Sequence, residues 1–140
     1  MKVYVAGPYQ QKEAIGWRAA ELRAVGIEVT SRWLEEPHSP TTQCGDLPDA
    51  TFRMYANYDL EDIDAADAFL LFAVPPNAAP IPRAGRHVEF GYALARRKKI
   101  FVVGDVKENI FHYLPQVKHF ENFALALAYF VNRNADVTGQ

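Results

Sequence analysis

Residues 68–74, with the sequence AFLLFAV, are the most apolar run of the chain and predict the central strand of a buried sheet. An apolar run without alternation is typical of a strand covered on both faces, as in parallel sheets with helices on each side. The start of the chain fits this architecture. Residues 3–6 and 27–30 predict two more strands, a helical pattern over 12–24 lies between them, and Gly26 is a natural helix stop.

The rest of the chain continues the alternation of helices and strands. We predict helices over 50–65, 86–97 and 123–132, strands at 100–103 and 119–120, a helical turn over 109–113, and loops over 35–49 and 75–86. These elements predict one α/β domain over residues 1–140. Its five-stranded, doubly wound parallel sheet is expected to have the flavodoxin-like (Rossmann-like) order 2-1-3-4-5.

Composition narrows the class of protein. With 140 residues and a net charge of -2, the chain suits one globular domain and offers no general basic surface for nucleic acid polymers or membranes. Its single cysteine, Cys44, rules out an internal disulfide and indicates a reduced, cytoplasmic protein. The apolar N-terminal run is too short for a signal peptide. The four histidines lack metal-ligand spacing, so we expect no metal or other cofactor.

Ligands of such sheets bind beyond the carboxyl ends of the strands. Several polar side chains follow predicted strands and should meet at that edge: Tyr9, Arg83, Arg86, His87 and Glu89.

Glu89 is the strongest candidate for a catalytic residue among them. We place it in the first turn of the helix over 86–97, where unpaired N–H groups and the helix dipole would keep a carboxylate ionised. An ionised carboxylate can act as a nucleophile, and at a glycosidic carbon it can stabilise or trap an oxocarbenium-like centre. An acid at such a position more often only complements the dipole, so position alone does not assign the role.

Two further groups of charges are candidates. Asp59 and Asp62 share a helix face. We assign Asp62, Asp64 and Asp67 to a solvated surface, and leave both a surface position and a functional role open for Asp59. The second group, Arg83, Arg86 and His87, could bind a 5′-phosphate or a carboxylate. It could equally consist of loop charges and an ordinary packed histidine.

Three segments together resemble the nucleoside 2-deoxyribosyltransferase superfamily, which also contains nucleoside 5′-monophosphate N-glycosidases. They are VYVAGPY at 3–9, YDLEDIDAADA at 58–68 and GRHVEFGYALA at 85–95, and the resemblance covers most of residues 3–130. The third segment is the most specific, because its glutamate before a helix of small and aromatic residues matches the family's nucleophile motif.

The resemblance implies roles for single residues. Glu89 matches the nucleophile that forms a covalent pentosyl-enzyme, and Tyr9 matches an aromatic residue that places the nucleophile or the sugar. Asp59 falls where the transferases use an acid that helps to protonate the base. Asn109 lies near the position at which a neighbouring subunit completes the sugar site, which implies a homodimer or higher oligomer. Gly7 is expected to contact substrate.

One departure bears on the substrate. The transferases carry a further acid shortly before the nucleophile, where this chain has Arg83, and a cation there suits an anionic substrate. Gly85, Arg86 and His87 complete a stretch closer to that of the nucleotide N-hydrolases. We therefore expect hydrolysis of a (2′-deoxy)nucleoside 5′-monophosphate. The alternatives are exchange of bases between nucleosides, and a non-catalytic nucleotide-binding or sensing module.

Overall fold

A five-stranded parallel sheet forms the centre of the computed structural model, which describes residues 1–37, 39, 41–75 and 84–138. The strand order is β2-β1-β3-β4-β5 and every neighbouring pair is parallel, so the predicted topology is confirmed. The strands are β1 (Lys2–Ala6), β2 (Glu28–Val29), β3 (Ala68–Phe72), β4 (Lys99–Val103) and β5 (Val117–Phe120).

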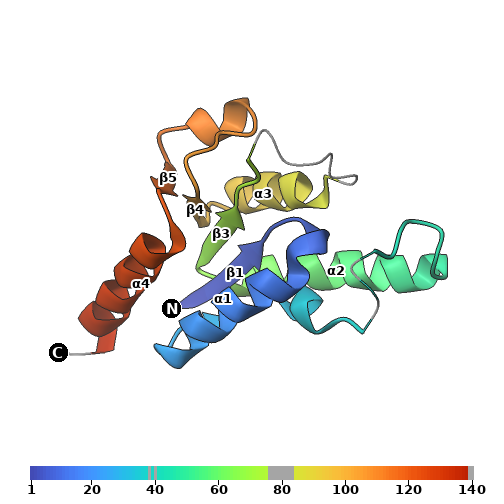
Figure 1. Ribbon diagram of the computed structural model, residues 1–140, viewed down its shortest axis with the longest axis horizontal. Helices are drawn as coiled ribbons and strands as arrows, with labels where there is room; N and C mark the ends of the chain where they lie inside the picture. The colour runs from blue at the N-terminus through green and yellow to red at the C-terminus, as the bar shows by residue number, and fades with distance from the viewer. Residues whose placement is uncertain (38, 40, 76–83, 139–140) are drawn as a thin grey trace.

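Helices cover both faces of this sheet (Figure 1). Helices α1 and α4 pack against each other, and α2 packs against α3, as expected when the direction of the crossovers reverses after β2. The helices are α1 (Lys12–Ala24), α2 (Asp49–Ala65), α3 (Gly85–Ala95) and α4 (Phe123–Thr138). Short 3-10 turns are η1 (Tyr9–Gln11), η2 (Arg32–Glu35) and η3 (Ile110–Tyr113). Within the described ranges, no helix is long and apolar enough to cross a membrane.

The core lies around β3, as its apolar sequence predicts. Residues 68–71 are fully buried, and Phe69 pairs in register with Tyr4 of β1. The rings of Tyr4 and Phe69 stack with centroids 5.6 Å apart, and Phe90 of α3 meets Phe69 edge to face. This aromatic packing holds α3 against the sheet and brings its first turns to the carboxyl ends of the strands.

Several boundaries differ from the predictions. Strand β2 is only two residues long, whereas β5 is longer than expected and α4 continues to Thr138. The ends of elements depend on tertiary partners: β2 pairs only with β1, at the edge of the sheet, whereas β5 follows β4 in register from Val117 to Phe120.

Close packing shapes the chain where β1 ends. A Cβ at Gly7 would meet Ile15 Cδ1, the flexible end of a side chain on α1, which would have to shift. Glycine therefore lets the chain turn directly over α1, and Tyr9 then lies at the edge of the sheet where ligands bind.

Candidate active site

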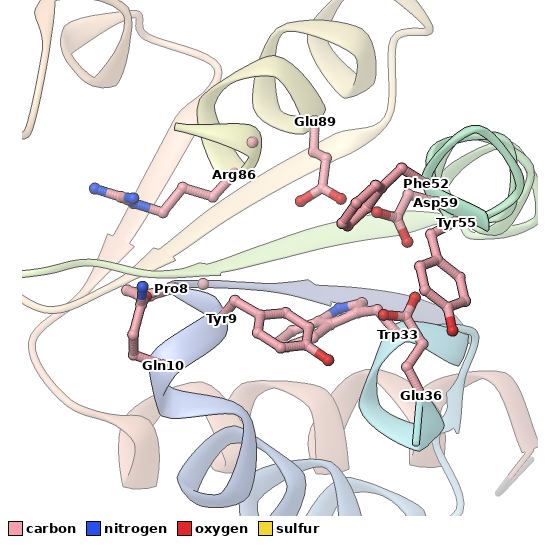
Figure 2. Close-up of a pocket in the computed structure, with 12 residues that line it drawn as sticks. Pro8, Tyr9, Gln10, Trp33, Glu36, Phe52, Tyr55, Asp59, Arg86 and Glu89 are labelled. Atoms are coloured by element: carbon pink, nitrogen blue, oxygen red, sulfur yellow. The ribbon is translucent and has the colours of Figure 1, made fainter. Parts of the chain in front are cut away.

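A cavity of about 180 Å³ opens at the carboxyl ends of β1 and β3 (Figure 2). Residues from the turn after β1, from η1, from η2 and the residue that follows it, and from α2 and α3 surround it. The lining residues are Gly7, Pro8, Tyr9, Gln10, Trp33, Glu36, Phe52, Tyr55, Asp59, Gly85, Arg86 and Glu89. The structure thus brings together six of the predicted site residues: Gly7, Tyr9, Asp59, Gly85, Arg86 and Glu89.

Two carboxyl groups from different helices meet in this cavity. Glu89 of α3 and Asp59 of α2 both point into it (Figure 2). The two side chains share a hydrogen bond. Burial, followed by the charge of Asp59, raises the pKa of Glu89 well above its ordinary value, and burial raises the pKa of Asp59 to about 6. Because two buried carboxylates in contact cannot both ionise cheaply, the pair holds one proton between them near neutral pH.

This pair corrects the expectation that the helix dipole keeps Glu89 ionised. Helix α3 begins at Gly85, and its first turn contains no acidic residue. Glu89 is the next residue after that turn, where the dipole acts weakly. Burial outweighs the dipole, so the pKa of Glu89 is raised and not lowered.

Tyr4 is a site residue that the sequence did not reveal. Its hydroxyl donates a hydrogen bond of 2.6 Å to Glu89 Oε2. Burial raises the pKa of Tyr4 well above its ordinary value, so the phenol stays protonated and remains a donor. In the sequence Tyr4 belongs to an apolar strand and looks like a core residue. The hydroxyl of Tyr4 among purely hydrocarbon side chains is the one feature of the sequence that could have indicated a role in the site.

Tyr9 lies on the wall facing Glu89, as Figure 2 shows, and has a different set of contacts. Its hydroxyl hydrogen-bonds Glu36 and accepts a bond of 3.2 Å from Lys12 Nζ. Its ring packs at 5.8 Å from that of Trp33, whose Nε1 donates to the Val5 carbonyl at 2.8 Å. A contact between Tyr9 and a sugar stays a prediction.

Glu36 is the second residue that the sequence did not reveal, because it falls in a segment interpreted as a loop. It follows η2, is half-buried and lines the cavity. Burial and the charge of Asp59 raise the pKa of Glu36 to about 7, against the lowering effects of Lys12 and the Tyr9 hydrogen bond. Lys12 Nζ also donates to the backbone carbonyl of Glu36.

Asp62 fixes the segment that carries Trp33 and Glu36. We expected Asp62 on a solvated surface, and this was wrong, since the residue is 6% exposed. Its Oδ2 accepts a bond of 2.9 Å from the Arg32 N–H, and its Oδ1 accepts one of 2.8 Å from Arg32 Nε. Sequence spacing placed Asp62 on the helix surface correctly, but only the tertiary structure covers that surface with η2.

The predicted anion-binding residues divide into two groups. Arg86 lines the cavity, but its Nη2 pairs with Glu108 Oε1 at 3.0 Å, and both side chains are nearly buried. His87 lies 3.9 Å from Glu108 and 3.4 Å from the Asn109 amide, outside the cavity lining. Burial and the charge of Arg86 lower the pKa of His87, so the imidazole is mainly neutral. Arg83 lies outside the described residues.

One cluster has side chains of the types that bind metals, although the sequence showed no such spacing. Ligand atoms of His87, Glu108 and His112 lie within 4.8 Å of one another. His112 Nδ1 accepts a bond of 3.3 Å from the Glu108 N–H, and Arg86 occupies Glu108 Oε1. Glu108 Oε2 and His112 Nε2 are buried and have no hydrogen-bond partner among the described residues. The cluster is thus a buried polar network next to Arg86.

Comparison with known proteins supports the fold. No protein-family model matches the chain, and no curated protein matches its sequence. The structure of the CMP N-glycosidase BcmB from Clostridium botulinum is similar, with 21% identity, 92% of this chain and 97% of that chain covered, and a TM-score of 0.55. A conserved protein from Enterococcus faecalis V583 has 16% identity, coverage of 95% and 98%, and a TM-score of 0.64. The fold implied by the sequence resemblance is confirmed.

Proposed function

We propose that this protein hydrolyses the N-glycosidic bond of a (2′-deoxy)nucleoside 5′-monophosphate through a covalent glycosyl-enzyme at Glu89. The observation that carries the proposal is the buried Glu89–Asp59 pair, with the Tyr4 hydroxyl on Glu89 Oε2, at the wall of a cavity. Cleavage of a glycosidic bond with a covalent intermediate needs one carboxylate as nucleophile and one proton donor. That BcmB is a CMP N-glycosidase with this fold adds support.

Because the pair holds a single proton, Glu89 can act as the nucleophile and Asp59 as the proton donor in the same step. As Glu89 attacks C1′, the electrons of the C1′–N bond move to the base, and the proton of the pair passes through Asp59 to the departing base. Loss of this proton leaves Glu89 ionised while it forms the ester bond. The Tyr4 hydrogen bond lowers the pKa of Glu89 and thus favours the ionised form that attacks.

The second step restores the pair. Asp59, now a carboxylate, removes a proton from water as the water oxygen attacks C1′ and the bond to Glu89 breaks. The products are the free base and the sugar 5′-phosphate, and the proton is again held by Asp59 and Glu89. No group outside the pair has to supply or accept a net proton.

The cavity has two ends that suit the two ends of a nucleotide. Phe52, Tyr55 and Trp33 supply aromatic surface on the side of Asp59, where a base can stack (Figure 2). Arg86 lies on the other side, and among the described lysines and arginines it is the one that lines the cavity, so it is the candidate to bind the phosphate. Because Glu108 already pairs with Arg86, a phosphate would share or replace that partner.

The test combines product analysis with trapping. Incubation with a panel of ribo- and deoxyribonucleoside 5′-monophosphates should release free base, and Glu89→Ala should abolish release. A 2′-fluoro nucleotide should slow the second step, so that mass spectrometry finds the sugar phosphate on the peptide containing Glu89. Absence of base release from every nucleotide would contradict the proposal. A ligand-induced rise in melting temperature without any product would instead support a binding module.

A further inference from the structure

Three carboxyl groups follow one another along the cavity. Figure 2 shows Glu89 on one wall, Asp59 beside it, and Glu36 beyond Asp59, next to Tyr55. Asp59 acts electrostatically on both of the others, as expected for the middle member. The proposed reaction uses Glu89 and Asp59 and leaves Glu36 without a role.

This order corresponds to positions on a nucleotide. If C1′ lies at Glu89, Asp59 meets the side of the base next to the glycosidic bond, and Glu36 meets the far edge. The far edge is where cytosine and adenine carry an exocyclic amino group and where uracil and hypoxanthine carry a keto oxygen. On the basis of the proposed function, we propose that Glu36 contacts this edge of the base and selects bases with an exocyclic amino group over their keto counterparts.

The contacts of Glu36 support this role. Lys12 donates to the Tyr9 hydroxyl at 3.2 Å, and Tyr9 hydrogen-bonds the Glu36 carboxyl group, so this chain of contacts orients Glu36. An ionised carboxylate only accepts hydrogen bonds. An amino group can donate a hydrogen bond to the carboxylate. A keto oxygen is itself an acceptor, so it would be repelled there.

The selectivity should depend on pH. Glu36 has a pKa of about 7, and the groups that act on it are Asp59 and Asp62 of α2, Lys12 of α1 and Tyr9 of η1. Its charge in turn raises the pKa of Glu89 on α3. Above that pH the carboxylate rejects a keto oxygen. Below it the protonated acid can donate to a keto oxygen, so the preference should shrink as the pH falls.

The experiment compares matched pairs of substrates. We expect kcat/KM for CMP to exceed that for UMP, and that for AMP to exceed that for IMP, by roughly 10-fold or more at about pH 8. Glu36→Gln, which can both donate and accept, should reduce each ratio to within about 3-fold of unity, mainly by improving the keto substrate. Glu35→Gln is the matched control, because Glu35 is the exposed neighbour with the same charge and should leave the ratios unchanged.

A wild-type preference for the keto substrates, or equal losses on both substrates in Glu36→Gln, would overturn the inference. Calorimetric binding of CMP and UMP to Glu89→Gln measures the same discrimination without turnover. If no nucleotide releases its base but CMP still binds more tightly than UMP, the proposed hydrolysis fails while the role of Glu36 stands. If bases are released without any amino preference, the proposed hydrolysis stands and the role of Glu36 fails.

Discussion

The phenol of Tyr4, on strand β1, donates a hydrogen bond of 2.6 Å to Oε2 of Glu89, on helix α3. The two residues are 85 positions apart in the chain, and the bond crosses from the central sheet to the helix layer. Stacking on Phe69 fixes the Tyr4 ring, so the hydroxyl meets Glu89 without reorganisation. In the proposed reaction this donor stabilises Glu89 while it is ionised.

Replacing Tyr4 by phenylalanine should lower kcat by about 100-fold with little change in KM, because the lost donor acts on the nucleophile and the stacking ring remains. Steady-state kinetics on the best nucleotide measures this. Tyr129→Phe is the control, since its hydroxyl bonds Arg133 on α4, far from the cavity. An unchanged kcat in Tyr4→Phe would show that the hydrogen bond has no catalytic consequence.

The Asp59–Glu89 pair should give a bell-shaped pH dependence of kcat/KM. Asp59 has a pKa of about 6, so activity should rise through about pH 6 as the pair passes from two protons to one, and fall at higher pH when the last proton leaves. Asp59→Asn should remove the limb near pH 6 and reduce kcat by roughly 100-fold or more. Asp64→Asn, on the same helix but bonded to Tyr92, should retain the wild-type profile. A profile that Asp59→Asn leaves unchanged contradicts the shared-proton mechanism.

Arg86 should act on the phosphate and not on the sugar or base. Arg86→Met should raise KM for a nucleoside 5′-monophosphate by roughly 10-fold and leave kcat/KM for the corresponding nucleoside unaltered. Since Glu108 is nearly buried, the single variant leaves its carboxylate without Arg86, and the double variant Arg86→Met, Glu108→Gln removes both charges. If both variants keep the wild-type ratio of kcat/KM for the nucleotide to kcat/KM for the nucleoside, another residue must bind the phosphate.

The carboxyl groups of the cavity should make the protein less stable at higher pH. The pKa of Glu36 is raised to about 7 in the folded state, so its stabilising effect is fully present below the unfolded pKa and is lost as the pH rises through about 7. Glu36→Gln should narrow the difference in unfolding free energy between about pH 5 and pH 8 by about 1 kcal/mol, a value reduced by the solvent around this half-buried group. Urea unfolding at both pH values measures the effect. A difference equal to that of Glu35→Gln would mean that Glu36 titrates as an ordinary surface acid.

The sequence was sufficient for the topology. The unbroken apolar run at 68–74 required a strand buried on both faces, and the helical pattern between two short strands required parallel pairing, because a crossover of that length cannot form a hairpin. The carboxyl ends of parallel strands share one edge, so Gly7, Tyr9 and Glu89 could be assigned to one site before any contact was known. The prediction that Glu89 is the nucleophile rested on the sequence motif around it.

The protonation states and the partners of these residues depended on the tertiary structure. Local position suggested that Glu89 is ionised, but burial beside Asp59 raises its pKa, and burial is a property of the packed molecule. Tyr4 looked like a core residue and Glu36 like part of a loop, because nothing near them in the sequence indicates which distant side chain they meet. Periodicity and motifs report neighbours along the chain, whereas the Tyr4–Glu89 bond and the line of three carboxyl groups arise only when separate elements pack together.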